Sequence, residues 1–294
     1  MAIRAAICYT YIRWGIALMT ELKYKFTNDT LFKMLFLKYP ELLRKLISVL
    51  LRIRVDSIEN FQIRNPEMPP ESLGDKFCRL DINMDVDGQR VDLEVQVDDD
   101  GGYYPERTLY YWAREYSTAL PTAVKYAELP RTVIISILGF KLFGCEEYHS
   151  EYQALEVTRH TPLSDKFALY YFELPKLPAT VTAENGLELW LSLFRAKTEE
   201  ELTNIEALGV QEMNEAITAY RQITVTPEFQ EAERLRSKAR HDEAQALWNE
   251  RHKAEREKAI EIAVRMLKRN RPINEIVEDT GLTHEEVEGL KTNT

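Results

Sequence analysis

The stretch from Leu80 to Gln96, LDINMDVDGQRVDLEVQ, constrains the fold of this chain more than any other. Polar and apolar residues alternate on both sides of Asp87-Gly88, which is the sequence pattern of a β-hairpin closed by a two-residue turn. Because side chains alternate across a strand, the polar residues of both strands share one face and the apolar residues share the other. The pattern therefore predicts a hairpin with one polar and one apolar face.

The predicted register brings two carboxylates opposite each other. Asp81 faces Glu94, which places their Cβ atoms about 4.5–5.5 Å apart. Like charges so placed repel each other unless a cation lies between them, and carboxylate oxygens on a rigid hairpin suit Mg²⁺. The alternative is an ordinary solvated face, on which Arg79 and Arg90 balance the acidic charge.

Composition limits the class of protein. The chain has 294 residues, enough for one large domain or two smaller ones, and its formal net charge is −10. That charge argues against a protein that coats nucleic acid nonspecifically, but it leaves room for an enzyme with a local basic groove. Cys8, Cys78 and Cys145 lie far apart, which indicates a reducing cytoplasm with neither a disulfide framework nor a zinc site.

The N-terminus is mildly apolar but does not read as a membrane anchor. The stretch from Ala5 to Leu18 is interrupted by Arg13 and has no clear cleavage site. It is also too short to span a bilayer. We interpret residues 1–20 as a tail upstream of the fold, with Met19 as an alternative start to Met1, and we expect no membrane partner.

The patterns that follow predict alternating helices and strands. A helix capped by Thr27 or Asn28 puts Asp29 and Lys33 on one face, and a second covers residues 40–52. After the hairpin, residues 105–120 form a helix, and residues 132–138 and 166–174 form strands, the first of them central. In the 105–120 helix we expect one stripe of Arg107, Tyr111 and Arg114, and packing by Leu109, Trp112, Ala113 and Tyr116.

Beyond Pro178 the sequence predicts helices only. We expect them over residues 187–194, 204–220 and 227–270, the last strongly charged and therefore a solvated or coiled-coil helix. Two short helices about Thr280-Gly281 have the outline of a helix-turn-helix. The second presents Glu285, Glu286 and Glu288, which suits protein contact or self-association better than base reading.

These changes in sequence pattern and composition divide the chain into four parts. We predict an N-terminal tail over residues 1–20, an α/β domain over 21–178, a helical region with the long charged helix over 179–254, and a C-terminal association segment over 255–294. The order of helices and strands is that of an α/β fold. Homo-oligomerisation through the C-terminal helices is expected.

At this point the residues resemble a known family. The segments NDTLFKMLF, RLDI, LEVQ and RTLYYWAREY, followed by an apolar strand, are similar in order and spacing to the recombination-promoting nucleases, also described as transposases, of the PD-(D/E)XK superfamily. The resemblance covers residues 22–174. The tail INEIVEDTGLTHEEV is also similar to the tails of that family.

The resemblance implies a restriction-endonuclease-like core, a mixed central sheet flanked by helices, followed by an all-helical C-terminal region. It implies a cytoplasmic, Mg²⁺-dependent endonuclease that cuts DNA, with Mn²⁺ able to substitute. Asp81 matches the first aspartate of the motif and Glu94 the acidic residue of the (D/E)XK element. Both would bind the metal, and the Val95 carbonyl would supply a third oxygen. Gln96 stands where the superfamily has lysine; it can orient a water but carries no charge.

Further matches extend this site. Asp29 matches an acidic position that often completes it, and Lys33, Arg107 and Tyr111 match recurrent positions. We expect catalytic roles for Asp29 and Lys33 and substrate contacts from Arg107, Tyr111 and Arg114, with Lys33 or Arg107 as candidates for the task of the missing lysine. Without the family, Asp29 is a first-turn helix residue, Lys33 pairs with it, Tyr111 belongs to the core and Arg107 to the surface.

Three functions fit the sequence. The first is a metal-dependent DNA endonuclease connected with recombination or mobile elements. The second is a degenerate nuclease fold that binds DNA or a protein without cutting, which Gln96 and the acidic net charge favour. The third is an interaction protein whose helical tail is the functional part.

Overall fold

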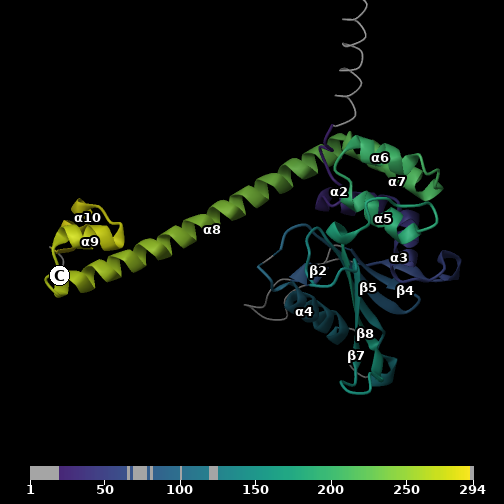
Figure 1. Cartoon of the computed structure of the whole chain (residues 1–294), viewed down its shortest axis with the longest axis horizontal. Helices are drawn as coiled ribbons and strands as arrows, with labels where there is room; N and C mark the ends of the chain where they lie inside the picture. Colours follow the sequence, from purple (N-terminus) through teal and green to yellow (C-terminus); the bar gives the residue numbers. More distant parts are fainter. Residues whose placement is uncertain are drawn as a thin grey trace, which may run out of the picture. The chain divides into compact units, whose positions relative to one another are not determined.

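The computed structural model of the chain describes residues 20–64, 67–68, 78–79, 82–99, 101–118 and 125–291. The chain divides into two compact units, Met1–Gln230 and Glu231–Thr294. The first contains the sheet and most of the helices, and the second is helical (Figure 1). The four-part division made from the sequence stays a prediction.

A mixed six-stranded sheet forms the centre of the first unit, as the sequence predicts. Strands β5, β6 and β8 are parallel, and the remaining pairs are antiparallel. A further antiparallel pair is separate from this sheet and consists of β2 (Glu67–Met68) and β3 (Cys78–Arg79). The strands of the large sheet, in spatial order, are β1 (Phe61–Ile63), β4 (Ile82–Val86), β5 (Gln89–Gln96), β6 (Thr132–Leu138), β8 (Pro162–Glu173) and β7 (His149–Leu155).

Helices cover both faces of the sheet (Figure 1). On one face the larger apolar core joins Phe32, Leu43 and Trp190 of three helices to sheet residues such as Leu93 and Ile135. Every residue of β6 is buried, which confirms its predicted central position. The helices of this unit are α2 (Asp29–Lys38), α3 (Pro40–Leu50), α4 (Tyr104–Ser117), α5 (Gly186–Arg195), α6 (Glu199–Glu206) and α7 (Gln211–Thr224), and the short 3₁₀ turns are η1 (Val55–Ser57), η2 (Tyr126–Glu128) and η3 (Leu174–Lys176).

Among the described helices, only α4 contributes to the smaller core on the opposite face. There Tyr104 packs with Ile134, Leu138, Leu169 and Tyr171 of β6 and β8. The helix connects β5 to β6, which are parallel neighbours, and so forms the crossover of a βαβ unit. This connection places α4 over the polar face of the hairpin.

The side of α4 that packs differs from the prediction. Leu109 is 47% exposed and Ala113 is exposed, whereas Tyr104, Thr108 and Glu115 are buried. The prediction assumed that the helix would bury its most apolar residues. It was wrong for Leu109 and Ala113 because α4 covers a sheet face that is itself polar, so that polar residues point inward.

Two other features were not predicted. The single helix expected over residues 204–220 is two helices, α6 and α7, separated by Gly209, whose φ of +73° ends the first one. Strand β7, with the sequence HSEYQAL, was not recognised. It is an edge strand with several exposed residues, so it lacks the apolar alternation that marks strands packed on a core.

Helix α2 begins at the predicted cap. The Asn28 side chain accepts a hydrogen bond from the Leu31 amide, at 2.9 Å. We expect Asn28→Ala to lower the free energy of unfolding by about 1 kcal/mol, because one amide of the first turn loses its acceptor. Urea denaturation measures the change. Asn204→Ala, at an exposed position inside α6, is the control; an equal loss in both variants would contradict the capping role.

The second unit is a small helical assembly. The long helix α8 (Pro227–Lys268) confirms the predicted charged helix and runs into this unit. Its Ala263 packs with Ile276, Leu282 and Val287 in a small apolar core. The remaining helices are α9 (Ile273–Thr280) and α10 (His284–Lys291).

The turn between α9 and α10 has the predicted form. Gly281 follows α9 with φ +68°, a left-handed conformation that favours glycine at a helix end. Glu286 of α10 forms an ion pair with Arg256 of α8, so one of the three glutamates of this helix supports the unit itself. Across the described part of the chain, no helix combines the length and the apolar character needed to cross a membrane.

Candidate functional site

The hairpin has the register that the sequence predicts. Asn83 pairs with Asp92 and Asp85 with Arg90 across β4 and β5. Asp87 and Gly88 have φ values of +48° and +75°, which the favoured two-residue hairpin turn requires. The Asp87 side chain also accepts hydrogen bonds from the amides of Glu59 (3.0 Å) and Asn60 (2.8 Å), which attach the turn to the chain before β1.

The structure describes one of the two carboxylates that the sequence predicts to face each other. Glu94 lies on β5, and Asp81 lies outside the described residues. The described pairs end at Ile82 and Leu93, and the same register continued by one residue would pair Asp81 with Glu94. That pairing stays a prediction.

The middle of the polar face of the hairpin is buried, which contradicts the solvated-face alternative. Asn83 is 2% exposed, Asp92 1% and Glu94 5%. The face is covered because α4 turns its own polar residues, among them Thr108 and Glu115, towards the sheet side of the helix. Carboxylates are seldom buried unless they are paired or bind a cation, so this face is a stronger candidate for a functional site than a solvated hairpin would be.

Arg107 of α4 lies close to both Glu94 and Gln96, the two outer residues of the predicted (D/E)XK element. Its Nη2 atom donates to Oε1 of Gln96 at 2.8 Å and lies 3.9 Å from Oε2 of Glu94. The Gln96 side chain also donates, from Nε2, to the Asp98 carbonyl at 2.8 Å. A positive charge from helix α4 therefore lies beside Glu94 and contacts Gln96, the residue predicted to occupy the lysine position of the motif.

Two aromatic rings hold the Arg107 guanidinium. The guanidinium carbon lies 4.5 Å from the ring centre of Tyr104 and 5.8 Å from that of Tyr111, within the range of cation–π attraction. Tyr104 is completely buried, and burial raises the pKa of its hydroxyl well above 10, with a further contribution from the negative charge of Glu94. Tyr111, a predicted substrate contact, is half-buried.

The other end of α4 is attached to the sheet by ion pairs. Glu115 is 3% exposed, and its carboxylate lies 3.0 Å from Arg64 and 3.2 Å from Arg90. Arg90 also donates to the Glu115 carbonyl at 2.8 Å. Burial lowers the pKa of Arg90, and the Glu115 charge opposes that change. These contacts fix the helix on which Arg107 stands.

The remaining predicted site residues lie on α2 and α4. Asp29 and Lys33 form an ion pair of 3.1 Å one turn apart on α2, which agrees with the predicted shared face. Arg114 is half-buried and lies seven residues after Arg107, about 10 Å further along the helix axis. The structure thus brings Glu94, Gln96, Arg107 and Tyr111 together, and Arg114 stands further from that group.

The donor atoms of this site suit a hard cation. Glu94 offers a buried carboxylate, and the sequence prediction adds the backbone carbonyl of the following residue, Val95. Oxygen donors of this kind are those that Mg²⁺ prefers. In the described ranges, no group of three or more His, Cys, Asp or Glu side chains is close enough to hold a metal. The expected additional carboxylate, Asp81, lies outside those ranges.

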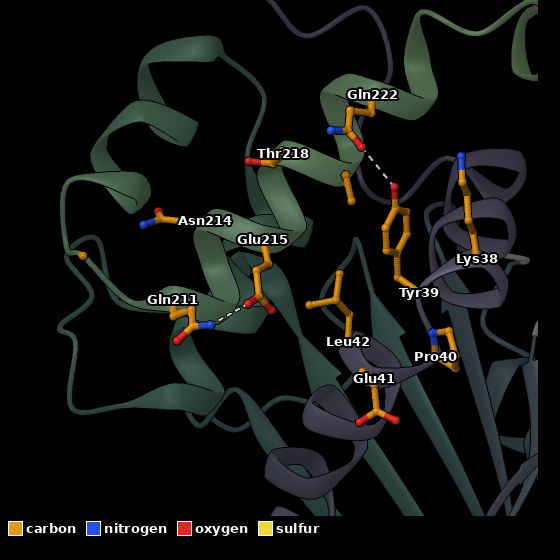
Figure 2. A pocket seen from close by; sticks show the side chains of 12 residues that line it. Lys38, Tyr39, Pro40, Glu41, Leu42, Gln211, Asn214, Glu215, Thr218 and Gln222 are labelled. Carbon is orange, nitrogen blue, oxygen red and sulfur yellow. Dashed lines mark hydrogen bonds between the residues drawn. The ribbon is translucent and has the colours of Figure 1, made fainter.

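A pocket lies elsewhere in the first unit. It has a volume of about 760 Å³ and lies between the corner of α2 and α3 and the polar side of α7 (Figure 2). In Figure 2, Tyr39 donates to Gln222 (3.1 Å), and Gln211 donates to Glu215 (2.7 Å). None of its lining residues belongs to β5 or α4. The sequence analysis did not identify this pocket. The polar residues of α7 recur at helical spacing, and this polar side of the helix was the signal that could have indicated it.

Comparison with known proteins identifies the family. The sequence model of the family described as PD-(D/E)XK nuclease family transposase matches residues 26–250. Comparisons with curated proteins and with solved structures give no match. The mixed sheet with its flanking helices agrees with this fold. The chain therefore belongs to the PD-(D/E)XK nuclease family transposases, as its resemblance indicates.

Proposed function

We propose that this protein is a metal-dependent endonuclease that hydrolyses phosphodiester bonds in DNA. Membership of a nuclease family supports the class of reaction. The observation that carries the proposal is the buried Glu94 carboxylate with the Arg107 guanidinium 3.9 Å away. A buried carboxylate can bind a metal ion, and a fixed guanidinium beside it can offset negative charge on a bound phosphate.

In this proposal Asp81, Glu94 and the Val95 carbonyl hold Mg²⁺, or Mn²⁺ in its place. The bound cation would supply Lewis acidity towards the phosphate oxygens and the attacking water. Asp29 would complete the site directly or through a water. Arg107 would offset charge at the phosphate, the task of the lysine in the superfamily motif.

The proposed role of Gln96 changes in the light of its contacts. Its amide oxygen accepts from Arg107 and its amide nitrogen donates to the Asp98 carbonyl. Both ends of the amide are therefore engaged, which favours a role in holding Arg107 over a role in orienting water. Of the two candidates for the task of the missing lysine, these contacts favour Arg107. Lys33 pairs with Asp29.

The remaining contacts with DNA are proposed for Tyr111 and Arg114. Both are half-buried on α4, the helix that carries Arg107. A connection with recombination or mobile elements rests on the family alone. Self-association through the C-terminal helices also stays a prediction.

The second candidate is a degenerate nuclease fold that binds DNA without cutting it. Gln96 in place of lysine favours it, as does the formal net charge of −10. The third candidate is an interaction protein whose helical tail is the functional part. It assumes a solvated hairpin face, which conflicts with the burial of Asp92 and Glu94.

One experiment separates the first two candidates. Supercoiled plasmid is incubated with the full-length protein and MgCl₂, MnCl₂ or EDTA, and nicked and linear products are measured. We expect cleavage with either metal and none with EDTA. Binding of DNA in a mobility-shift assay without cleavage under any metal would reject the endonuclease in favour of the binding protein.

A further inference from the structure

Tyr104 is a buried residue whose hydroxyl the proposed reaction does not yet use. It is 0% exposed and packs at the first turn of α4 against Phe140, 6.0 Å away, and Tyr171, 6.3 Å away, between ring centres. Arg107, one turn further along α4, lies over its ring. The ring is therefore fixed between the apolar core of this face and the guanidinium beside Glu94.

The Tyr104 side chain packs beside buried polar groups of the site. Ser136 is the neighbour of Glu94 across the parallel strands β5 and β6, and it is 1% exposed. Ser136, Arg107 and the negative charge of Glu94 all affect the pKa of the Tyr104 hydroxyl. Ser136 and Arg107 are within hydrogen-bonding reach of this hydroxyl, but among the described residues neither contact has the geometry of a well-formed hydrogen bond.

A buried hydroxyl whose hydrogen bonds are poorly formed is costly. The neighbouring tyrosine shows the usual solution, because the Tyr171 hydroxyl contacts the Thr108 hydroxyl at 2.5 Å. A tyrosine hydroxyl carries a proton at neutral pH, so it can donate to a carboxylate.

Contacts place Glu94 beside Tyr104. Tyr104 packs on Ile134 and Leu138, which lie on either side of Ser136 on the same face of β6, and Ser136 pairs with Glu94. Arg107 lies over the Tyr104 ring and 3.9 Å from the Glu94 carboxylate.

We propose that Tyr104 is a positioning residue for Glu94, donating its buried hydroxyl to that carboxylate when the site binds its metal. This inference rests on the proposed metal-dependent function. Carboxylates that bind metals are usually held by hydrogen bonds from a second layer of residues, and such bonds fix their orientation. Arg107 would hold the Glu94 carboxylate from one side and Tyr104 from within the core.

The test compares two tyrosine-to-phenylalanine variants of the full chain. Tyr104→Phe removes the proposed donor and keeps the ring that packs under Arg107. Tyr171→Phe is the matched control: it removes a buried hydroxyl from the same apolar cluster, but that hydroxyl contacts Thr108. Mn²⁺ binding is measured by titration calorimetry, and plasmid cleavage gives kcat and KM. Circular dichroism and thermal melting verify the fold.

We expect Tyr104→Phe to weaken Mn²⁺ binding and to lower kcat, each about 10- to 100-fold, with KM for DNA unchanged. Tyr171→Phe should leave Mn²⁺ binding within about twofold of the wild type. Unchanged metal binding in a well-folded Tyr104→Phe protein would overturn the positioning role, as would equal losses in both variants. Failure of the proposed function is distinguishable, because wild-type protein would then bind no Mn²⁺ or would bind it without cutting DNA.

Discussion

Replacing Glu94 by glutamine is expected to reduce metal-dependent DNA cleavage by at least a factor of about 1,000, equivalent to about 4 kcal/mol in the barrier. Glutamine has the same shape but no negative charge, so a cation at this position loses its strongest proposed ligand. The fold should persist, because Arg107 keeps its hydrogen bond to Gln96. Initial rates of plasmid nicking, measured against MgCl₂ concentration, give the effect.

The control for this prediction is Glu106→Gln, which removes an exposed carboxylate from α4. It changes the net charge by the same amount and should leave cleavage within about twofold. Asp81→Ala should resemble Glu94→Gln. If Glu94→Gln protein retains wild-type activity while circular dichroism shows a native fold, Glu94 is not a metal ligand and the site assignment fails.

Replacing Arg107 by alanine is expected to lower kcat roughly 100- to 1,000-fold, the usual cost of removing one fixed donor from a site that stabilises charge. The reason is its position, 2.8 Å from Gln96 and 3.9 Å from Glu94. Arg159→Ala, which removes a mostly exposed arginine from the β7–β8 connection, is the control. An unaffected rate in Arg107→Ala would show that its charge plays no part.

A second substitution tests whether Arg107 performs the task of the missing lysine. Gln96→Lys alone should lower activity, because it places an ammonium group beside the guanidinium. In the Arg107→Ala background the same change should restore cleavage at least about tenfold, a coupling of about 1.4 kcal/mol in a double-mutant cycle. If the effects of the two substitutions are additive, Arg107 does not perform the task of a lysine at position 96.

The register of the hairpin is the part of the site that local sequence determines most completely. Asp87-Gly88 dictates the turn, and the turn dictates that Asn83 faces Asp92. This follows from backbone geometry alone, without knowledge of the rest of the fold. The apolar strand β6 is similarly evident, because seven consecutive buried residues need a position between two neighbours.

The environment of that hairpin depends on tertiary contacts and was harder to predict. Nothing local to Asp92 or Glu94 indicates that α4 covers them, so a solvated face was a reasonable alternative. The same difficulty explains the error at Leu109: periodicity identifies the apolar side of a helix, but a polar sheet face selects the other side. Arg107 was one of two candidates, since contacts between a helix and a strand cannot be decided from spacing.

The two-residue turn of the hairpin has a consequence for insertions and deletions. Glu94 lies seven residues after Asp87, about 23 Å along an extended strand. Adding or deleting one residue in the turn would reverse the side on which each following side chain of β5 lies. Glu94 would then enter the apolar core, and Val95 would face α4. The coding sequence therefore tolerates a change of residue at this turn more readily than a change of its length.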